Sequence, residues 1–142
     1  MNLTSMPHET TFPIRTFHTD SFGHVNNAKY LELLEEARWR YAEDNGLMKL
    51  LTRHNLGFII IDMRLRFRDE VVEGDRITIS TQLLTLGSGS GEVEQLVRKE
   101  GQSKIALKSL FHFILVDREA RNPVPIEGDI RQLLLGVIAN PD

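Results

Sequence analysis

The stretch HTDSFGHVNNAKYLELLEEARWRY, residues 18–41, decides how this chain is expected to fold. Its second half places apolar side chains at steps of three and four, which is the spacing of one face of an α-helix. These side chains are Tyr30, Leu33, Leu34, Ala37 and Tyr41. Asn26 or Asn27 is suited to cap the start of the helix and Gly46 to end it. The sequence therefore predicts a helix over residues 27–45, the longest in the chain.

After this helix the apolar period changes to two, the period of a strand with one buried face. Residues 59–68 alternate in this way and predict a half-buried strand. Its predicted inward residues are Ile59, Ile61, Met63, Leu65 and Phe67. Three further strands are predicted at 77–83, 93–99 and 104–116, and one before the helix at 11–18. A short amphipathic tail follows at 130–138.

Short polar turns join the four strands that follow the helix, which favours antiparallel pairing. A helix of about 18 residues is roughly 27 Å long and can cover one face of a five-stranded sheet. The predicted class is therefore α+β, with one long helix on a five-stranded antiparallel sheet. A chain of 142 residues is expected to form one domain over its whole length, residues 1–142.

The composition, with 41% hydrophobic and 26% charged residues, is that of a globular protein without a long apolar span. A net charge of −3 gives no overall attraction to nucleic acid or to anionic lipid. The chain has no cysteine, which excludes disulfides and thiolate chemistry, and residues 1–9 lack the pattern of a secretory signal. We expect a cytoplasmic protein without a membrane span, whose partners are small molecules or proteins and not nucleic acid.

Polar groups crowd the predicted start of the long helix. Capping needs one side chain, yet Asp20, His24, Asn26 and Asn27 lie around Gly23, where the backbone can approach a ligand closely. A helix N-terminus offers unpaired N–H groups that suit an oxyanion developing on a carbonyl. A carboxylate beside it could activate water or attack directly, and a histidine could orient the water or share its proton. The cluster suits acyl transfer to water, although an ordinary turn and cap would use the same residue types.

The order Asp20, Gly23, His24, Val25, Asn26, Asn27 and Tyr30 resembles the D-x-x-G-x-V-N-N-x-x-Y signature of hotdog-fold thioesterases of the 4-hydroxybenzoyl-CoA thioesterase type. MRLRFRDEVVEGD and VDREARNPVPI resemble later segments of that family, in the expected order. The resemblance implies a sheet wrapped around one long central helix. It also implies hydrolysis of an acyl-CoA or acyl carrier protein thioester to an acid and a thiol, no cofactor, and a homodimer or homotetramer with sites at the interface.

The resemblance also implies roles for individual residues. Asp20 matches a carboxylate proposed as nucleophile in some members and as general base in others. The backbone N–H of Asn27 matches the group that polarises the thioester carbonyl. His24 matches a histidine of plant acyl carrier protein thioesterases, but those enzymes have an asparagine where this chain has Phe22. Other positions of the motif are expected to contact substrate, namely Gly23, Asn26 and Tyr30.

Candidate binding residues outside the motif lie on the strand at 59–68. Arg64, Arg66 and Arg68 share one face of this strand, and guanidinium groups hold phosphates such as those of CoA through paired hydrogen bonds. The alternative is a solvated sheet surface. Met63 and Phe67 are expected in the core or in the wall of an acyl pocket. His112 is expected in the core or at an interface.

Three alternatives stay open at this level. One is a hydratase or dehydratase of the same fold, and another is an acyl-CoA-binding domain without turnover. His18, Asp20 and His24 could gather a metal, since imidazole and carboxylate are common ligands, but no metal site is predicted. Residues 87–91, GSGSG, match G-x-S-x-G, but they are expected to form a hairpin loop because a nucleophile elbow needs a strand that enters a helix.

Overall fold

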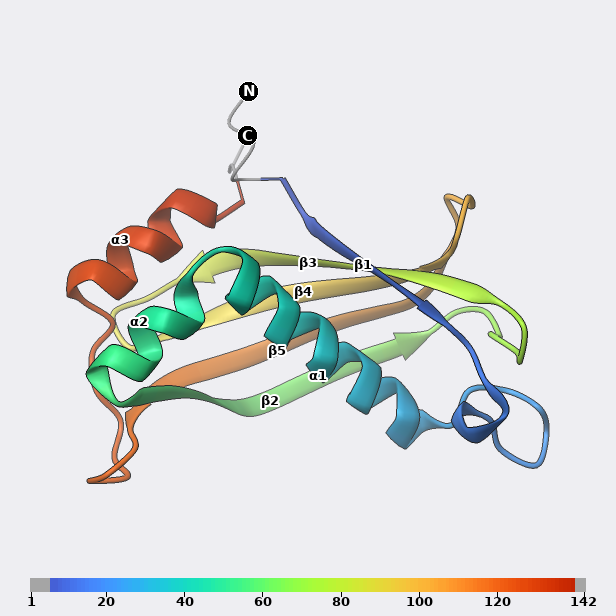
Figure 1. Cartoon of the computed structure of the whole chain (residues 1–142), viewed down its shortest axis with the longest axis horizontal. Helices are drawn as coiled ribbons and strands as arrows, with labels where there is room; N and C mark the ends of the chain where they lie inside the picture. Colours follow the sequence, from blue (N-terminus) through green and yellow to red (C-terminus); the bar gives the residue numbers. More distant parts are fainter. Residues whose placement is uncertain (1–5, 140–142) are drawn as a thin grey trace.

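The computed structural model of the chain describes residues 6–139, with one antiparallel sheet and three helices in that part. The strands are β1 (His8–Pro13), β2 (Leu56–Phe67), β3 (Arg76–Leu86), β4 (Ser90–Lys99) and β5 (Ile105–Asp117), in the sheet order β1-β3-β4-β5-β2. The helices are α1 (Asn27–Asp44), α2 (Leu47–His54) and α3 (Gly128–Val137). Figure 1 shows α1 crossing one face of the sheet, with α2 and α3 near its C-terminal end.

The predicted α+β class and the five-stranded antiparallel sheet are confirmed. The long helix ends before Gly46, as predicted, because α1 stops at Asp44. The φ of 85° at Gly46 then turns the chain from α1 directly into α2, a helix that the sequence prediction missed. The first strand was predicted at 11–18 but runs over His8–Pro13. The strand ends at Pro13, and a short 3₁₀ turn follows at Thr16–His18.

Strand β2 contains a bulge that breaks the predicted alternation. Its register with β5 shifts between Ile60 and Asp62, which leaves Ile61 unpaired. Ile60 pairs with Phe113 before the shift and Met63 pairs with Phe111 after it, and both phenylalanines are buried under the helices. The prediction that Ile59 and Ile61 face inward is therefore wrong, since they are 48% and 58% exposed. Met63, Leu65 and Phe67 do lie on the helix side.

The buried side of α1 carries Tyr30, Leu33, Leu34 and Ala37, as the spacing predicts. It packs on β3, β4 and β5, and a polar network crosses this contact. Gln95 of β4 is fully buried, and its Nε2 donates to the carbonyl of Leu34 and to Oγ1 of Thr81, both at 3.0 Å. Its Oε1 accepts from Arg38 of α1 at 2.9 Å. This network fixes the long helix over the middle of the sheet.

On the opposite side of the sheet His112 is not a core residue. Its Nε2 lies 3.0 Å from Glu92 on the neighbouring strand, and its side chain is 42% exposed. The GSGSG segment joins β3 to β4 as a hairpin turn closed by Gly87 N–H to the carbonyl of Ser90 at 2.7 Å, as predicted. Within residues 6–139, no helix is both long enough and apolar enough to cross a membrane.

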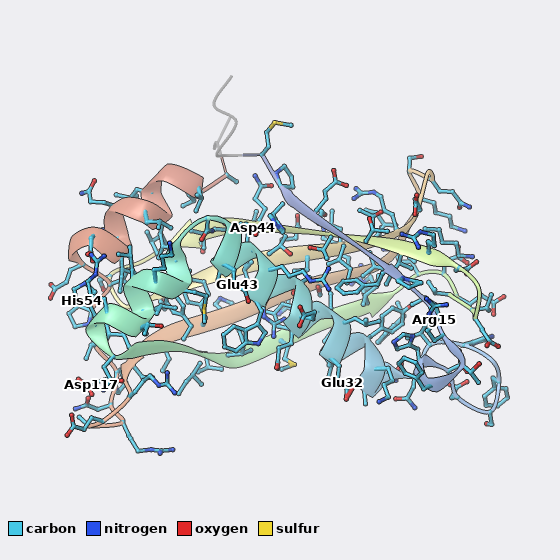
Figure 2. All side chains as sticks on the ribbon, in the orientation of Figure 1. Arg15, Glu32, Glu43, Asp44, His54 and Asp117 are labelled. Atoms are coloured by element: carbon cyan, nitrogen blue, oxygen red, sulfur yellow. The ribbon has the colours of Figure 1, made fainter. Side chains whose placement is uncertain are left out.

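An ion pair joins the end of α2 to the start of α3. His54 Nε2 lies 2.9 Å from Oδ1 of Asp129, and Figure 2 shows His54 at the end of α2. The hydrogen bond from His54 is the main reason why the pKa of Asp129 lies below its ordinary value of 3.8. Because the folded state lowers this pKa, the stabilisation is complete above 3.8 and disappears as the pH falls through the lower folded value.

We expect Asp129→Asn to lower the melting temperature at pH 6 by at most about 4 °C, because the pair is exposed. Calorimetry of both proteins between pH 6 and pH 2 measures this difference. The two melting temperatures are expected to converge below the ordinary carboxyl pKa of 3.8. A difference that stays constant down to the lowest pH would contradict the assignment.

Candidate active site

The loop before α1 is closed tightly upon itself. The backbone N–H of Asp20 donates to the carbonyl of His24 at 2.8 Å, and the N–H of Gly23 donates back to the carbonyl of Asp20 at 3.0 Å. Gly23 has a φ of 81°, a conformation that favours glycine. Val25 N–H binds the carbonyl of Val71 at 2.9 Å, which attaches the loop to the segment after β2. The loop is therefore a fixed scaffold for its polar side chains.

The carboxylate of Asp20 has one oxygen engaged and one free. Oδ1 accepts hydrogen bonds from the backbone N–H groups of Phe22 at 2.9 Å and His24 at 3.3 Å. Among the described residues Oδ2 has no partner, and the side chain is exposed. These two N–H donors fix the direction of the carboxylate. The second oxygen is available to a water molecule or to a substrate.

The start of α1 supplies a free donor beside this carboxylate. Asn26 caps the helix, as predicted, because its side chain accepts from the N–H of Ala28 at 2.8 Å. The N–H of the next residue, Asn27, donates to no acceptor in residues 6–139. This N–H belongs to the positive end of the helix dipole. It can therefore stabilise negative charge on a carbonyl oxygen.

A hollow of about 290 Å³ brings these groups together. Its walls include Asp20, His24, Asn27, Tyr30, Phe67 and Glu70. Tyr30 is buried and its ring lies 5.7 Å from that of Phe67, so the two rings form an apolar floor. Burial, together with Asp69 and Asp75, raises the pKa of Tyr30 to about 12, and its phenol stays neutral near pH 7. Gly23 and Asn26, which were also predicted at the site, do not line this hollow.

Sequence reasoning missed Glu70, whose Oε2 lies 2.5 Å from Nε2 of His24. Glu70 belongs to the segment between β2 and β3, and no spacing or motif connects it with the loop. Only the backbone pairing of residues 24 and 25 with 71 and 72 brings the two side chains together.

None of the three predicted arginines lines the hollow. Arg64 pairs with Leu110 and Arg66 with Lys108, on the sheet face opposite to α1. Arg68 directly follows β2, and its N–H donates to the carbonyl of Ala106 at 2.8 Å. None of the three has an ion-pair partner among the described residues. The structure therefore leaves these guanidinium groups open to solvent.

The alternative metal site of His18, Asp20 and His24 has no support in the structure. Nδ1 of His18 accepts a hydrogen bond from the backbone N–H of Arg15 at 2.8 Å, and burial lowers the pKa of His18. Within residues 6–139, no three side chains of the ligand types are grouped so that they could hold a metal ion.

A second and larger cavity, of about 960 Å³, lies between the helix layer and β2. Its walls include Trp39 and Ala42 of α1, Leu51 of α2, Phe58 and Met63 of β2, and Phe113 of β5. The first turn of α1 and Phe67 at the end of β2 line the smaller hollow. Helix α1 and strand β2 therefore line both the hollow and the larger cavity. In Figure 2, Glu32 marks the N-terminal half of α1, and Asp117 of β5, which lines the larger cavity, lies toward the other end of the molecule, on the side of His54.

A comparison with known protein families identifies the family of this chain. A model of the thioesterase-like superfamily matches residues 14–134, which include the loop, all of α1 and the four strands that follow. The chain belongs to the thioesterase-like superfamily. The hotdog fold predicted from the D-x-x-G-x-V-N-N-x-x-Y signature is confirmed at this level, with a five-stranded antiparallel sheet and three helices in the described residues.

Several individual proteins are similar to this chain over most of its length. The long-chain acyl-CoA thioesterase FadM of Escherichia coli is 33% identical over 126 residues, which are 89% of this chain and 96% of that protein. The crystal structure of the probable thioesterase YbaW of Escherichia coli has a TM-score of 0.84 and 32% identity, covering 92% of this chain and 98% of that one. The Staphylococcus aureus protein SAV2348, solved in complex with CoA, has a TM-score of 0.83 at 13% identity, covering 92% and 83% of the two chains, and shows the common fold alone.

Proposed function

We propose that this protein is an acyl-CoA thioesterase, which hydrolyses an acyl thioester to a free acid and the CoA thiol. The observation that carries the proposal is the free carboxylate oxygen of Asp20 beside the free N–H of Asn27, in one hollow at the start of α1. The 33% identity with FadM, named a long-chain acyl-CoA thioesterase, supports the same reaction. Release of a free thiol from acyl-CoA by the purified protein tests it.

The arrangement performs the hydrolysis in three steps. Asp20 removes a proton from a water molecule, whose oxygen attacks the thioester carbonyl carbon. The carbonyl oxygen becomes an oxyanion, which the N–H of Asn27 and the helix dipole stabilise. The C–S bond then breaks, and the thiolate takes the proton from Asp20. If Asp20 is instead the nucleophile, an acyl anhydride forms first and water hydrolyses it.

The large cavity is the proposed site of the acyl chain. From Asn27 to Ala42 the helix rises by about 22 Å. The small hollow lies at the start of this length and the larger cavity, which Trp39 and Ala42 line together with Glu35 and Arg38, lies toward its end. A carbonyl at the start of α1 would direct a long alkyl chain along the helix and into the cavity. Long-chain acyl groups are therefore the proposed substrate class, with CoA as carrier and acyl carrier protein as the alternative.

Filling the cavity tests this assignment. We expect Ala42→Phe to lower kcat/KM for palmitoyl-CoA about tenfold or more, because the new ring occupies the space of the chain end. The value for butyryl-CoA is expected to change less than about twofold. Glu43→Phe adds the same ring at an exposed neighbouring position and serves as the control. Equal losses for both substrates in Ala42→Phe would contradict a chain-binding cavity.

The CoA phosphates are proposed to contact basic residues near the end of β2. Arg68 is the best placed of the three arginines because it directly follows Phe67, which lines the hollow. Arg64 and Arg66 lie further along the other face of the same strand and are proposed as additional contacts. Gly23, Asn26 and Tyr30 are proposed to shape the site around the thioester.

We further propose that the chain assembles through β2, as a homodimer or a homotetramer. β2 is a 12-residue strand at one edge of the sheet, and Ile59, Ile61, Met63 and Phe67 are each about half exposed on it. A long apolar edge strand is a template for pairing, and two copies would pair isologously. Light scattering is expected to give at least twice the 16.3 kDa of one chain. A monomer at micromolar concentration would contradict this assembly.

The remaining proposals concern the whole chain. Residues 1–142 form one hotdog domain in which α1 is the central helix, and the protein acts in the cytoplasm without a cofactor. The chain's 142 residues suit one hydrophobic core, and the absence of cysteine is typical of proteins outside oxidising compartments.

A further inference from the structure

The closest polar contact in the small hollow is between His24 and Glu70, at 2.5 Å from Nε2 to Oε2. The two side chains are 46% and 57% exposed, and the backbone beside them is hydrogen-bonded. Residue 24 is bridged to residue 72, and Val25 N–H binds the carbonyl of Val71 at 2.9 Å. The backbone N–H of Glu70 donates to Oδ1 of Asp69 at 3.0 Å. The backbone therefore sets the two side chains against each other.

The chemistry of the two groups determines how the imidazole is oriented. An ionised carboxylate only accepts hydrogen bonds, so the nitrogen that faces Glu70 carries a proton. In a neutral imidazole the lone pair then lies on Nδ1. Nδ1 of His24 has no partner among the described residues, and His24 lines the same hollow as Asp20. Nδ1 is thus available to a molecule in the hollow.

We propose that Glu70 is a positioning residue that holds His24 with its Nε2–H toward the carboxylate and its Nδ1 toward the hollow. His24 then accepts one hydrogen bond from the attacking water through Nδ1, while Asp20 removes the other proton of that water. Glu70 also lines the hollow, but in this proposal it acts only through His24. This role rests on the proposed thioesterase function, since it concerns the same site. It is the role that a second carboxylate plays behind a histidine in other hydrolytic sites.

Steady-state kinetics of Glu70→Ala test the proposal. We expect kcat to fall about tenfold, with KM for acyl-CoA changed less than twofold and an unchanged melting temperature. In the His24→Ala background, Glu70→Ala is expected to cause no further loss, because the positioned group is gone. Glu73→Ala removes a carboxylate from the same segment that bonds Thr16 instead, and it is expected to keep the wild-type kcat. An unchanged kcat in Glu70→Ala, or an equal loss with and without His24, would overturn the proposal.

A spectroscopic measurement separates this proposal from the proposed function. In ¹⁵N-labelled wild-type protein we expect the Nε2 proton of His24 at low field, as in a strong hydrogen bond, and we expect that signal to disappear in Glu70→Ala. The measurement needs no substrate. Absence of thiol release with the signal present would refute the thioesterase function alone. Absence of the signal in wild-type protein, with normal thiol release, would refute the positioning role alone.

Discussion

Asp20→Asn is expected to lower kcat for acyl-CoA hydrolysis by about 10³-fold, within the range of about 10²–10⁴ that a general base contributes. The side-chain oxygen of asparagine can still accept the hydrogen bonds that Phe22 and His24 donate to Oδ1 of Asp20. The loop therefore keeps its structure while the site loses its negative charge. Thiol release measured at saturating substrate gives the change in kcat.

Two controls test whether the loss of kcat comes from the chemical step and not from a change in folding. The melting temperature of Asp20→Asn is expected to stay within about 2 °C of wild type, whereas Asp20→Ala also removes the turn and lowers it further. Glu36→Gln removes a carboxylate on the outer side of α1 that pairs with Arg40, and it is expected to keep full activity. Wild-type turnover in Asp20→Asn would remove Asp20 from the mechanism.

The second large effect is expected in the buried network under α1. Gln95→Leu removes the oxygen that accepts from the guanidinium of Arg38 and the amide that donates to Thr81. Burial already lowers the pKa of Arg38, so its charge is poorly solvated. We expect the free energy of unfolding to fall by about 3 kcal/mol, and the melting temperature by about 10 °C. Urea unfolding followed by circular dichroism measures the first quantity.

A double substitution tests the cause of this loss. Arg38→Met with Gln95→Leu removes both ends of the hydrogen bond, so the combined loss is expected to be smaller than the sum of the single losses by at least about 1 kcal/mol. Glu94→Leu makes a polar-to-leucine change on the other face of β4 and is expected to change stability by less than about 0.5 kcal/mol. Additive losses would mean that Arg38 and Gln95 contribute independently.

Much of the fold could be predicted because its signals are local. The three- and four-residue spacing from Tyr30 to Ala37 and the alternation in β3 and β4 each depend on a single element. The bulge at Ile61 could not be predicted, since it depends on the pairing of β2 with Phe111 and Phe113 of another strand. Helix α2 was missed because eight residues give too short a period to separate a helix from a loop.

In the candidate site, too, the features set by local sequence could be predicted and those set by tertiary contacts could not. Asp20, His24 and Asn27 lie in one loop and helix start, so their proximity follows from the sequence, and the structure places them in one hollow. Glu70 contacts His24 only because the backbone of residue 24 pairs with that of residue 72. The cavity beside Met63 depends on the distances between α1, α2 and β2 in the folded protein. Neither follows from a motif. Arg64 and Arg66 share one face of β2, as predicted, whereas Arg68 follows the end of the strand. Only the sheet register shows that this face points away from α1.

The central claim is that the Asp20 carboxylate and the start of α1 hydrolyse an acyl thioester. The most direct measurement is thiol release by the purified wild-type protein from butyryl-, palmitoyl- and benzoyl-CoA, with product analysis of crotonyl-CoA in parallel. The account predicts release of CoA thiol, fastest from palmitoyl-CoA, and loss of that release in Asp20→Asn. Addition of water to crotonyl-CoA without thiol release would indicate a hydratase, and tight binding of acyl-CoA without turnover would indicate a binding domain. Either result would contradict the account.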